Sequence, residues 1–273
     1  MAAAPGQDLA PHVSAAAEPL AGPWETPLGP FTVTNSMFTM WLTMVGILAL
    51  AWFATRHIRR DPESALVPGG LQNVAETVTE FLMELVESTV GRRYAGRVFA
   101  FGATFFVFIT ISNWSSLLPG IGTIWIPSEI VHDGHLEPIA APLFRPATAD
   151  INMTIALALT AFVVIHASGI SSHGPLGHLK EMTQVAFLAP VFIIIELFVI
   201  ISLSFRLFGN LFAGEVLLNG PILGAFALGH LPLIGAVFLV LEILFGLVQA
   251  VIFFMLSMVF TGQSVGPDTA EAH

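Results

Sequence analysis

An apolar stretch of the sequence, residues 193–216, carries side chains of the kinds that hold or pass protons: Glu196, Arg206, Asn210 and Glu215. A charge near the middle of a bilayer costs roughly 2.5–3.5 kcal/mol on insertion scales, so it is rarely kept without a partner, water or a function. The guanidinium of arginine keeps its proton in proteins. Arg206 is therefore expected to need a carboxylate or a wet cavity beside it.

Helical spacing places these groups on different faces. At 100° per residue, Arg206 and Asn210 lie within about 40° of each other, whereas Glu215 falls on roughly the opposite face from Arg206. Glu215 is thus poorly placed to neutralise Arg206 within the helix. Glu196 lies about 80° from Arg206, which leaves open whether it belongs to the site or is structural.

The next apolar segment, residues 233–261, adds Glu242 and Gln249, which are seven residues apart and so lie on one stripe of a helix. Carboxylates and amides can pass protons along water or hydrogen-bonded chains. This stripe and the polar groups of the preceding segment predict a polar path through the bilayer. Two simpler interpretations stay open: Arg206 as half of a structural ion pair, and Gln249 as an interhelical hydrogen bond.

The composition places these groups in a membrane protein. Of the 273 residues, 55% are hydrophobic and 10% are charged, against about 25% charged in a typical soluble domain. Residues 98–128 and 151–179 contain no Asp, Glu, Lys or Arg, and apolar runs of about 18 residues or more are typical of membrane spans. The protein is therefore predicted to cross the membrane several times.

The same composition excludes several classes of site. The net charge of −10 gives no surface for nucleic acid, and the absence of cysteine excludes disulfides and thiolate metal sites. No phosphate-binding loop of the G-x-x-x-x-G-K type is present, so no chemistry on ATP is expected in this chain. No cofactor or metal site is predicted, and these histidines are interpreted as solvated loop residues: His132, His135, His173 and His178.

The predicted fold class is all-α: a polytopic membrane protein with about five membrane helices and one amphipathic surface helix. Residues 1–35 are predicted to be an extracytoplasmic tail without regular structure, 36–261 a membrane domain, and 262–273 a cytoplasmic tail. The membrane spans are expected at 36–55, 98–118, 150–167, 186–219 and 233–261, with loops at 119–149 and 171–184.

Two parts of this domain have special character. Residues 71–94 place apolar side chains at helical spacing with glutamates on other faces, which predicts an amphipathic helix that lies at the membrane surface or against a protein partner. The last two segments, within 186–261, are predicted to form a hairpin whose helices are longer than the bilayer is thick. Residues 191–219, for example, would span roughly 43 Å as a helix, against a hydrocarbon core of about 30 Å. A steep tilt of this hairpin is expected, because its arms stay apolar to their ends.

The basic residues predict the orientation. Seven of the nine fall on one side of the five-span scheme, which is then the inside, so the N-terminus lies outside and the C-terminus in the cytoplasm. Arg145 alone falls on the outer side, and Arg206 lies within the membrane. The seven inner residues are Arg56, Arg59, Arg60, Arg92, Arg93, Arg97 and Lys180.

Several motifs together resemble subunit a of the membrane sector of F-type ATP synthases. The motifs are Ser202-Leu203-Ser204-Phe205-Arg206-Leu207-Phe208-Gly209-Asn210 with Ala213-Gly214-Glu215, Asn113-Trp114 with Leu117-Leu118-Pro119-Gly120, and Val248-Gln249-Ala250 with Phe253. They occur in the family's order from about residue 70 to 260.

The resemblance implies a stator subunit that passes protons through two offset half-channels to and from the carboxylates of a c-subunit ring, so driving rotation and ATP synthesis. Arg206 matches the family's essential arginine, which faces the ring carboxylate, and the proton path is implied to involve Asn210, Glu215, Glu242 and Gln249. Further implied partners are peripheral-stalk b subunits and the rest of the ATP synthase, and the implied location is the cell inner (plasma) membrane. The subunit is implied not to be an enzyme alone.

The chain departs from the family pattern in two places. The family commonly pairs a Glu with a His at the positions of Glu215 and Glu242, whereas here both are Glu. Val199-Ile200 stands where a basic residue and Pro often precede the signature. A secondary transporter that couples ions to a solute is the alternative function, although the paired repeats and broken helices usual in such folds are not evident. The coupling ion, proton or sodium, stays open.

Overall fold

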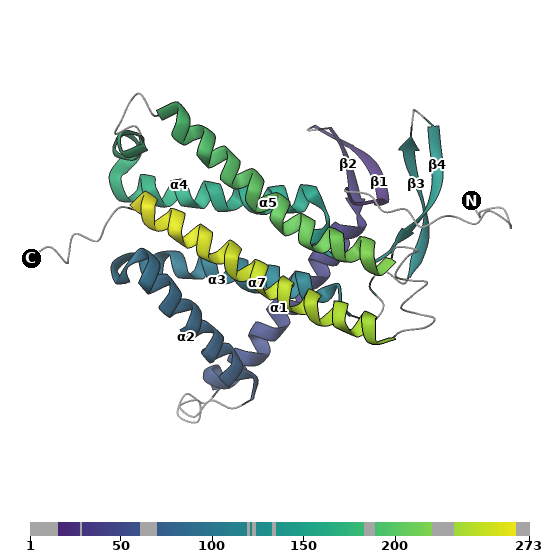
Figure 1. Cartoon of the computed structure of the whole chain (residues 1–273), viewed down its shortest axis with the longest axis horizontal. Helices are drawn as coiled ribbons and strands as arrows, with labels where there is room; N and C mark the ends of the chain where they lie inside the picture. The colour runs from purple at the N-terminus through teal and green to yellow at the C-terminus, as the bar shows by residue number, and fades with distance from the viewer. Residues whose placement is uncertain are drawn as a thin grey trace, which may run out of the picture. The chain divides into compact units, whose positions relative to one another are not determined.

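The computed structural model describes residues 16–27, 29–60, 70–118, 121, 124–132, 135–182, 189–219 and 232–265. Its helices are α1 (Asn35–Arg60), α2 (Leu71–Val90), α3 (Arg92–Ser115), α4 (Ile151–Met182), α5 (Ala189–Asn219) and α7 (Pro232–Val265) (Figure 1). The strands β1 (Pro19–Thr26) and β2 (Gly29–Thr34) form one antiparallel hairpin, and β3 (Trp125–His132) and β4 (His135–Pro142) form another. A short 3-10 helix, η2 (Ala147–Ala149), precedes α4.

The helices confirm a polytopic all-α membrane protein. Within the described ranges, four helices are long and apolar enough to cross a membrane: Asn35–Arg56, Arg92–Ser115, Ile151–Gly177 and Val237–Val265. Helix α5, with 31 residues, occupies the position of the remaining predicted span, 186–219. Large apolar side chains stand exposed along α1 and α7, such as Leu48 and Val240, which suits a lipid environment. The steep tilt of the hairpin formed by α5 and α7 stays a prediction.

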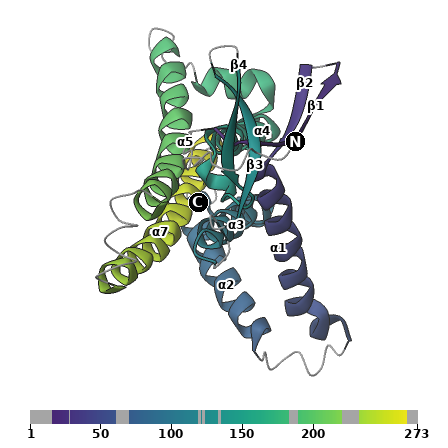
Figure 2. The ribbon, with the colours of Figure 1, turned by 90° about the vertical axis from the view of Figure 1, so that its right-hand side faces the viewer.

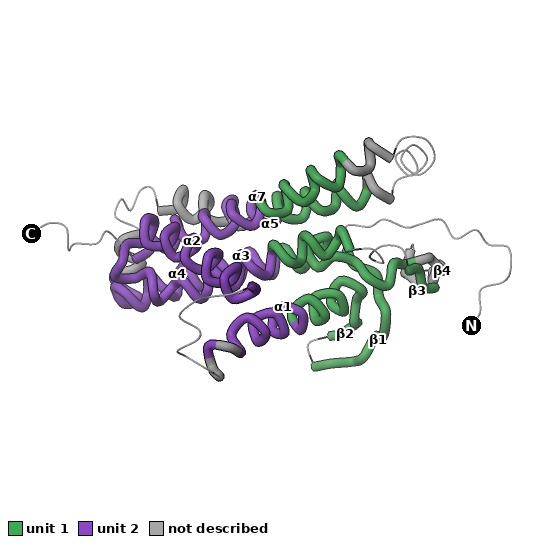
Figure 3. Tube along the Cα trace, turned by 90° about the horizontal axis from the view of Figure 1, so that it is seen from below, with its two compact units in different colours: residues 1–44, 110–154, 205–247 green, residues 45–109, 155–204, 248–273 purple. Residues whose placement is uncertain are grey.

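The chain forms two compact units, and each is built from three separate segments (Figure 3). Unit 1 comprises residues 1–44, 110–154 and 205–247, and unit 2 comprises residues 45–109, 155–204 and 248–273. The long helices contribute to both units, and the site residues on α5 and α7 are divided between the two units.

In unit 1, the two β-hairpins lie beside one another (Figure 2), and the Ser128 hydroxyl donates to the carbonyl of Pro19 at 2.7 Å. Helix α4 begins after Asp150, whose Oδ1 accepts the backbone N–H of Asn152 at 3.0 Å and so caps the helix. The other oxygen of Asp150 accepts the hydroxyl of Ser36, in the first turn of α1, at 2.7 Å. The beginnings of α1 and α4 are thereby held together.

In unit 2, aromatic side chains pack α3 against α7. The rings of Phe105 and Phe253 stack with centroids 5.2 Å apart, and Phe106 meets Phe254 edge to face. Gly102 permits this approach, because a Cβ atom there would stand 2.8 Å from the Phe254 ring. At this contact, the large rings on α7 pack against α3 where Gly102 has no side chain.

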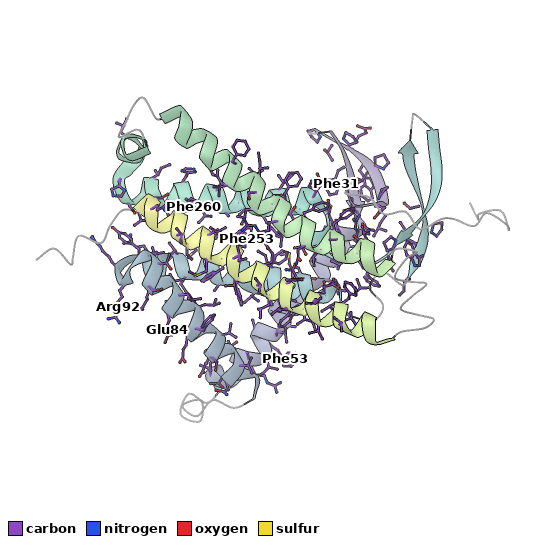
Figure 4. All side chains as sticks on the ribbon, in the orientation of Figure 1. Phe31, Phe53, Glu84, Arg92, Phe253 and Phe260 are labelled. Atoms are coloured by element: carbon purple, nitrogen blue, oxygen red, sulfur yellow. The ribbon has the colours of Figure 1, made fainter. Side chains whose placement is uncertain are left out.

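Helix α2 confirms the predicted amphipathic pattern. Leu82, Val86 and Val90 are buried, at helical spacing, whereas Glu80 and Glu84 are exposed. Figure 4 shows Glu84 projecting away from α3 and α7. Gly91, at φ 84°, separates α2 from α3, so the amphipathic helix ends four residues earlier than expected.

Three sequence-based expectations are corrected. The predicted tail contains the hairpin of β1 and β2, while residues 1–15 lie outside the described residues. The predicted loop at 119–149 contains β3 and β4. The predicted loop at 171–184 is helical up to Met182, with a kink at the non-helical Gly174. Pro175 starts the helix that follows the kink, and proline is tolerated in a first turn because its missing N–H would have no helical partner there.

Candidate functional site

Arg206 lies on the part of α5 that belongs to unit 1, and its side chain is exposed. Among the described residues it has no ion pair and no hydrogen bond. The interpretation of Arg206 as half of an internal structural ion pair is therefore not supported within the described part of the chain. Glu196 also lies on α5, but its side chain is outside the described residues.

Asn210, one turn after Arg206, faces a cavity of about 190 Å³ between α5 and α7 in unit 1. The amide nitrogen of Asn210 is buried and has no hydrogen-bond partner in the described residues. Because a water molecule needs only about 10–15 Å³ of such space and two or more polar partners, the cavity is large enough for several waters. The lining residues are Asn210, Ala213, Gly214, Phe238, Leu241, Glu242 and Phe245.

The carboxylate of Glu242 lies at this cavity and against the backbone of α5. A Cβ atom at Gly214 would stand 3.0 Å from Oε1 of Glu242, so only glycine leaves the carboxylate its full room. The hydroxyl of Ser116, just after the end of α3, lies 3.0 Å from the same oxygen. Glu242 is thus reached by a polar group from a third segment that the sequence analysis did not identify.

Ser116 can serve Glu242 in either protonation state. Its Oγ also lies 2.6 Å from the carbonyl oxygen of Asn113, which only accepts. A serine hydroxyl carries one proton and two lone pairs. It can donate to an ionised Glu242, or it can donate to Asn113 and accept the proton of a neutral Glu242. The contact therefore survives when Glu242 gains or loses a proton.

Asn113 fixes this arrangement to α7. Its Nδ2 donates to the carbonyl of Gly246 at 2.9 Å, and its Oδ1 accepts the hydroxyl of Thr148 at 2.9 Å. The indole N–H of Trp114 donates to the carbonyl of Ile243 at 3.1 Å. A Cβ atom at Gly246 would meet Asn113 at 3.1 Å, so glycine permits the close approach. The Asn113-Trp114 motif therefore positions the segment that carries Glu242.

Glu215 is paired, but with a cation that the sequence analysis left in a loop. Its Oε2 accepts two N–H groups of Arg145, from Nη2 at 3.1 Å and from Nε at 3.3 Å. Arg145 is 1% exposed and also pairs with Glu18, at 3.3 Å. Glu215 is therefore neutralised by a cation from another segment, and its placement on the face opposite Arg206 stays a prediction.

Gln249 lies on the part of α7 that belongs to unit 2. It is buried, and its Nε2 has no hydrogen-bond partner among the described residues. An interhelical hydrogen bond from that nitrogen, the simpler interpretation of Gln249, is therefore absent from the described part of the chain. A buried amide without a partner costs free energy, so Gln249 is one of the few unsatisfied polar groups of the described residues.

Of the predicted residues, Asn210 and Glu242 line one cavity. The structure adds Ser116 and Asn113 beside Glu242, and Arg145 and Glu18 beside Glu215. One signal for Arg145 was visible: it is the one basic residue on the outer side of the span scheme. Within the described residues, no group of three or more His, Cys, Asp or Glu side chains could hold a metal ion. The chemistry available here is proton transfer among carboxylates, a hydroxyl, amides and water.

Comparison with known proteins gives one consistent result. The sequence profile of the family described as ATP synthase A chain matches residues 37–262. ATP synthase subunit a of Mycobacterium ulcerans (strain Agy99) is 36% identical over 234 residues, which cover 85% of this chain and 87% of the relative. The chloroplastic subunit a of Stigeoclonium helveticum is 34% identical over 231 residues, covering 84% and 83%. ATP synthase subunit a of Mycobacterium bovis (strain ATCC BAA-935 / AF2122/97) is 34% identical over 240 residues, covering 87% and 89%.

Proposed function

The chain belongs to the ATP synthase subunit a family, and we propose that it is the stator subunit that passes protons to and from a rotating ring of c subunits. In this role it does no chemistry on ATP and couples proton movement to rotation. Its multi-pass membrane domain lies in the cell inner (plasma) membrane, with the N-terminus outside and the C-terminus in the cytoplasm. Peripheral-stalk b subunits are proposed as further partners of the chain.

The state of Arg206 carries the proposal. A guanidinium on a membrane helix that is exposed and lacks an ion pair among the described residues has a strong need for a counter-charge. A carboxylate on each passing c subunit would supply it. Arg206 would stabilise the ionised form of that carboxylate and block direct leakage between the two half-channels.

The cavity between α5 and α7 supports the rest of the path. A proton entering from outside would pass Glu215 and Glu242 and neutralise a ring carboxylate, which could then turn into lipid. After nearly a full revolution it would be released to the inside. The membrane potential supplies about 2.3 kcal/mol per charge per 100 mV. Asn210, which lines this cavity, is proposed to order water in it, and Gln249 is proposed to belong to the proton path.

The test is Arg206→Ala in the complete ATP synthase, reconstituted in vesicles. We expect ATP synthesis driven by a proton gradient to be abolished, while the c ring still co-purifies with the chain. Arg92→Ala is the matched control, because Arg92 is an exposed arginine whose ion pair with Glu87 is solvated. Undiminished synthesis by the Arg206 variant would remove Arg206 from the mechanism. The absence of a c ring from the purified complex would overturn the proposal as a whole.

A further inference from the structure

We propose that Arg145 is a positioning residue that holds one oxygen of Glu215 and leaves the other for proton exchange, and that Glu18 anchors Arg145 for this task. The proposal rests on the proposed function, since it assigns Glu215 to the proton path. It concerns residues of unit 1 alone. It gives the N-terminal segment, expected from the sequence to be a tail, a place beside the proton path.

The guanidinium of Arg145 is saturated with acceptors. Its three nitrogens donate to the carbonyl oxygens of Ala16 and Ala149 and to the carboxylates of Glu18 and Glu215, at 2.9–3.4 Å. These four groups surround a planar, rigid fork with five N–H groups. A lysine ammonium presents three N–H groups at one point and cannot reach all four. The arrangement therefore fixes the orientation of the cation as well as its charge.

The two oxygens of Glu215 are unequal as a result. Oε2 accepts both N–H groups of Arg145, whereas Oε1 accepts no hydrogen bond from the described residues. An oxygen held by two charge-assisted bonds is a poor site for an exchanging proton. Proton exchange at Glu215 is thus directed to Oε1.

Glu18 is the anchor on the other side of Arg145. It is 3% exposed, and its Oε2 also accepts Nδ2 of Asn35 at 2.8 Å. The backbone N–H of Asn35 donates to the carbonyl of Glu18 at 3.0 Å, and Nδ2 of Asn35 reaches the carbonyl of Pro142. Both the backbone and the side chain of Glu18 are therefore hydrogen-bonded to Asn35 at the beginning of α1.

The charges of this cluster do not cancel when all groups are ionised. Arg145 contributes one positive charge, against Glu18, Glu215 and the nearby Asp150, which caps α4. The N-termini of α1 and α4 offset part of the excess negative charge through their helix dipoles. Glu242 faces α5 from α7 at Gly214, one residue before Glu215. The proton balance at Glu215 thus depends on a cation that it shares with Glu18.

The decisive variant is Glu18→Gln in the complete ATP synthase in vesicles. Glu25→Gln is the control, because Glu25 is exposed on β1, the strand that begins directly after Glu18. The measurement is ATP-driven proton pumping per c ring present, as a function of pH. Without the Glu18 carboxylate, Arg145 no longer shares its charge between Glu18 and Glu215, so Glu215 releases its proton more readily. We expect the pH profile of pumping to move toward lower pH by about one unit, the size of effect that one neighbouring charge produces. The Glu25 variant should match the wild type.

Arg145→Lys provides the second measurement. It keeps the positive charge, so we expect assembled complex that pumps more slowly than wild type, whereas Arg92→Lys should have no effect. An unchanged pH profile for Glu18→Gln, or reduced assembly with a normal profile in the complexes that remain, would overturn the proposal and leave Arg145 a structural residue. The Arg206→Ala variant separates the two levels: if it abolishes synthesis while Glu18→Gln behaves as wild type, the proposed function stands and this inference fails.

Discussion

The hydroxyl of Ser116 lies 3.0 Å from Oε1 of Glu242, across 126 residues of sequence. This contact joins the segment after α3 to the carboxylate on α7, within unit 1. It gives Glu242 a polar partner that tolerates both its protonation states. Glu215, in contrast, has a cation as its partner. The two carboxylates proposed for one path therefore have different surroundings.

Removing the Ser116 hydroxyl tests its role at Glu242. Ser116→Ala is expected to lower proton flux by about tenfold, because a hydrogen bond to a carboxylate contributes about 1.5–3 kcal/mol and each 1.4 kcal/mol is tenfold in rate. Passive proton conduction through the membrane sector measures this. Ser116→Thr keeps the hydroxyl and should retain most of the flux. Ser88→Ala, which removes an exposed hydroxyl from α2, is the control; equal flux in all three variants would contradict a role for the contact.

Gly214→Ala is expected to displace the carboxylate of Glu242. The new Cβ atom would stand 3.0 Å from Oε1 and 3.2 Å from Cδ, closer than such contacts normally allow. Proton flux should fall, while the complex still assembles, because the side chain of Glu242 can turn aside. Gly46→Ala on α1 is matched to it, since nothing lies within 4 Å of a Cβ there. Wild-type flux in the Gly214 variant would show that the position of Glu242 is not critical.

Asn113→Ala is expected to reduce stability. It removes the partner of the Gly246 carbonyl and of the Thr148 hydroxyl. Each buried polar group left without a partner costs about 1–3 kcal/mol. The thermal unfolding midpoint of the detergent-solubilised complex should fall by several degrees. Asn73→Ala, at an exposed position of α2, should leave the midpoint unchanged. An equal midpoint for the two variants would show that the hydrogen bonds of Asn113 do not stabilise the protein.

Gly102→Val is expected to disturb the packing of α3 on α7 in unit 2. A Cβ atom at Gly102 already stands 2.8 Å from the Phe254 ring and 2.9 Å from Cε of Met258, and valine adds two more methyl groups. Overpacking of this kind typically costs about 1–3 kcal/mol. The yield of assembled complex and its unfolding midpoint measure the effect. Gly96→Val, at an exposed position of α3 with no atom within 4 Å of its Cβ, should be tolerated.

The helices could be predicted because their signals are local. Long apolar runs give the spans, and helical spacing of apolar residues predicts the amphipathic α2. Of those residues Leu82 and Val86 are buried, whereas Val74 and Phe81 are exposed. The two hairpins gave no such signal. Proline occurs in all four strands, and proline is normally depleted from strands because it cannot donate a ladder hydrogen bond. Composition alone therefore indicated a tail and a loop.

The candidate site was only partly predictable for a different reason. Arg206 and Asn210 were identified because a charge and an amide are rare in an apolar helix. Arg145 and Ser116 were not, because their importance comes from contacts with residues 70 and 126 positions away. A helical wheel relates residues of one helix and carries no information about the groups that another segment brings to it.

The cluster around Arg145 also constrains how the protein is made. Glu18 is synthesised first, its cationic partner follows 127 residues later, and the second carboxylate comes 70 residues after that. During synthesis, Glu18 therefore lacks Arg145 until that residue has been made, and Arg145 lacks Glu215 until α5 has been made. The cluster cannot form before Glu215 has been synthesised, so a chain that ends before this residue lacks it.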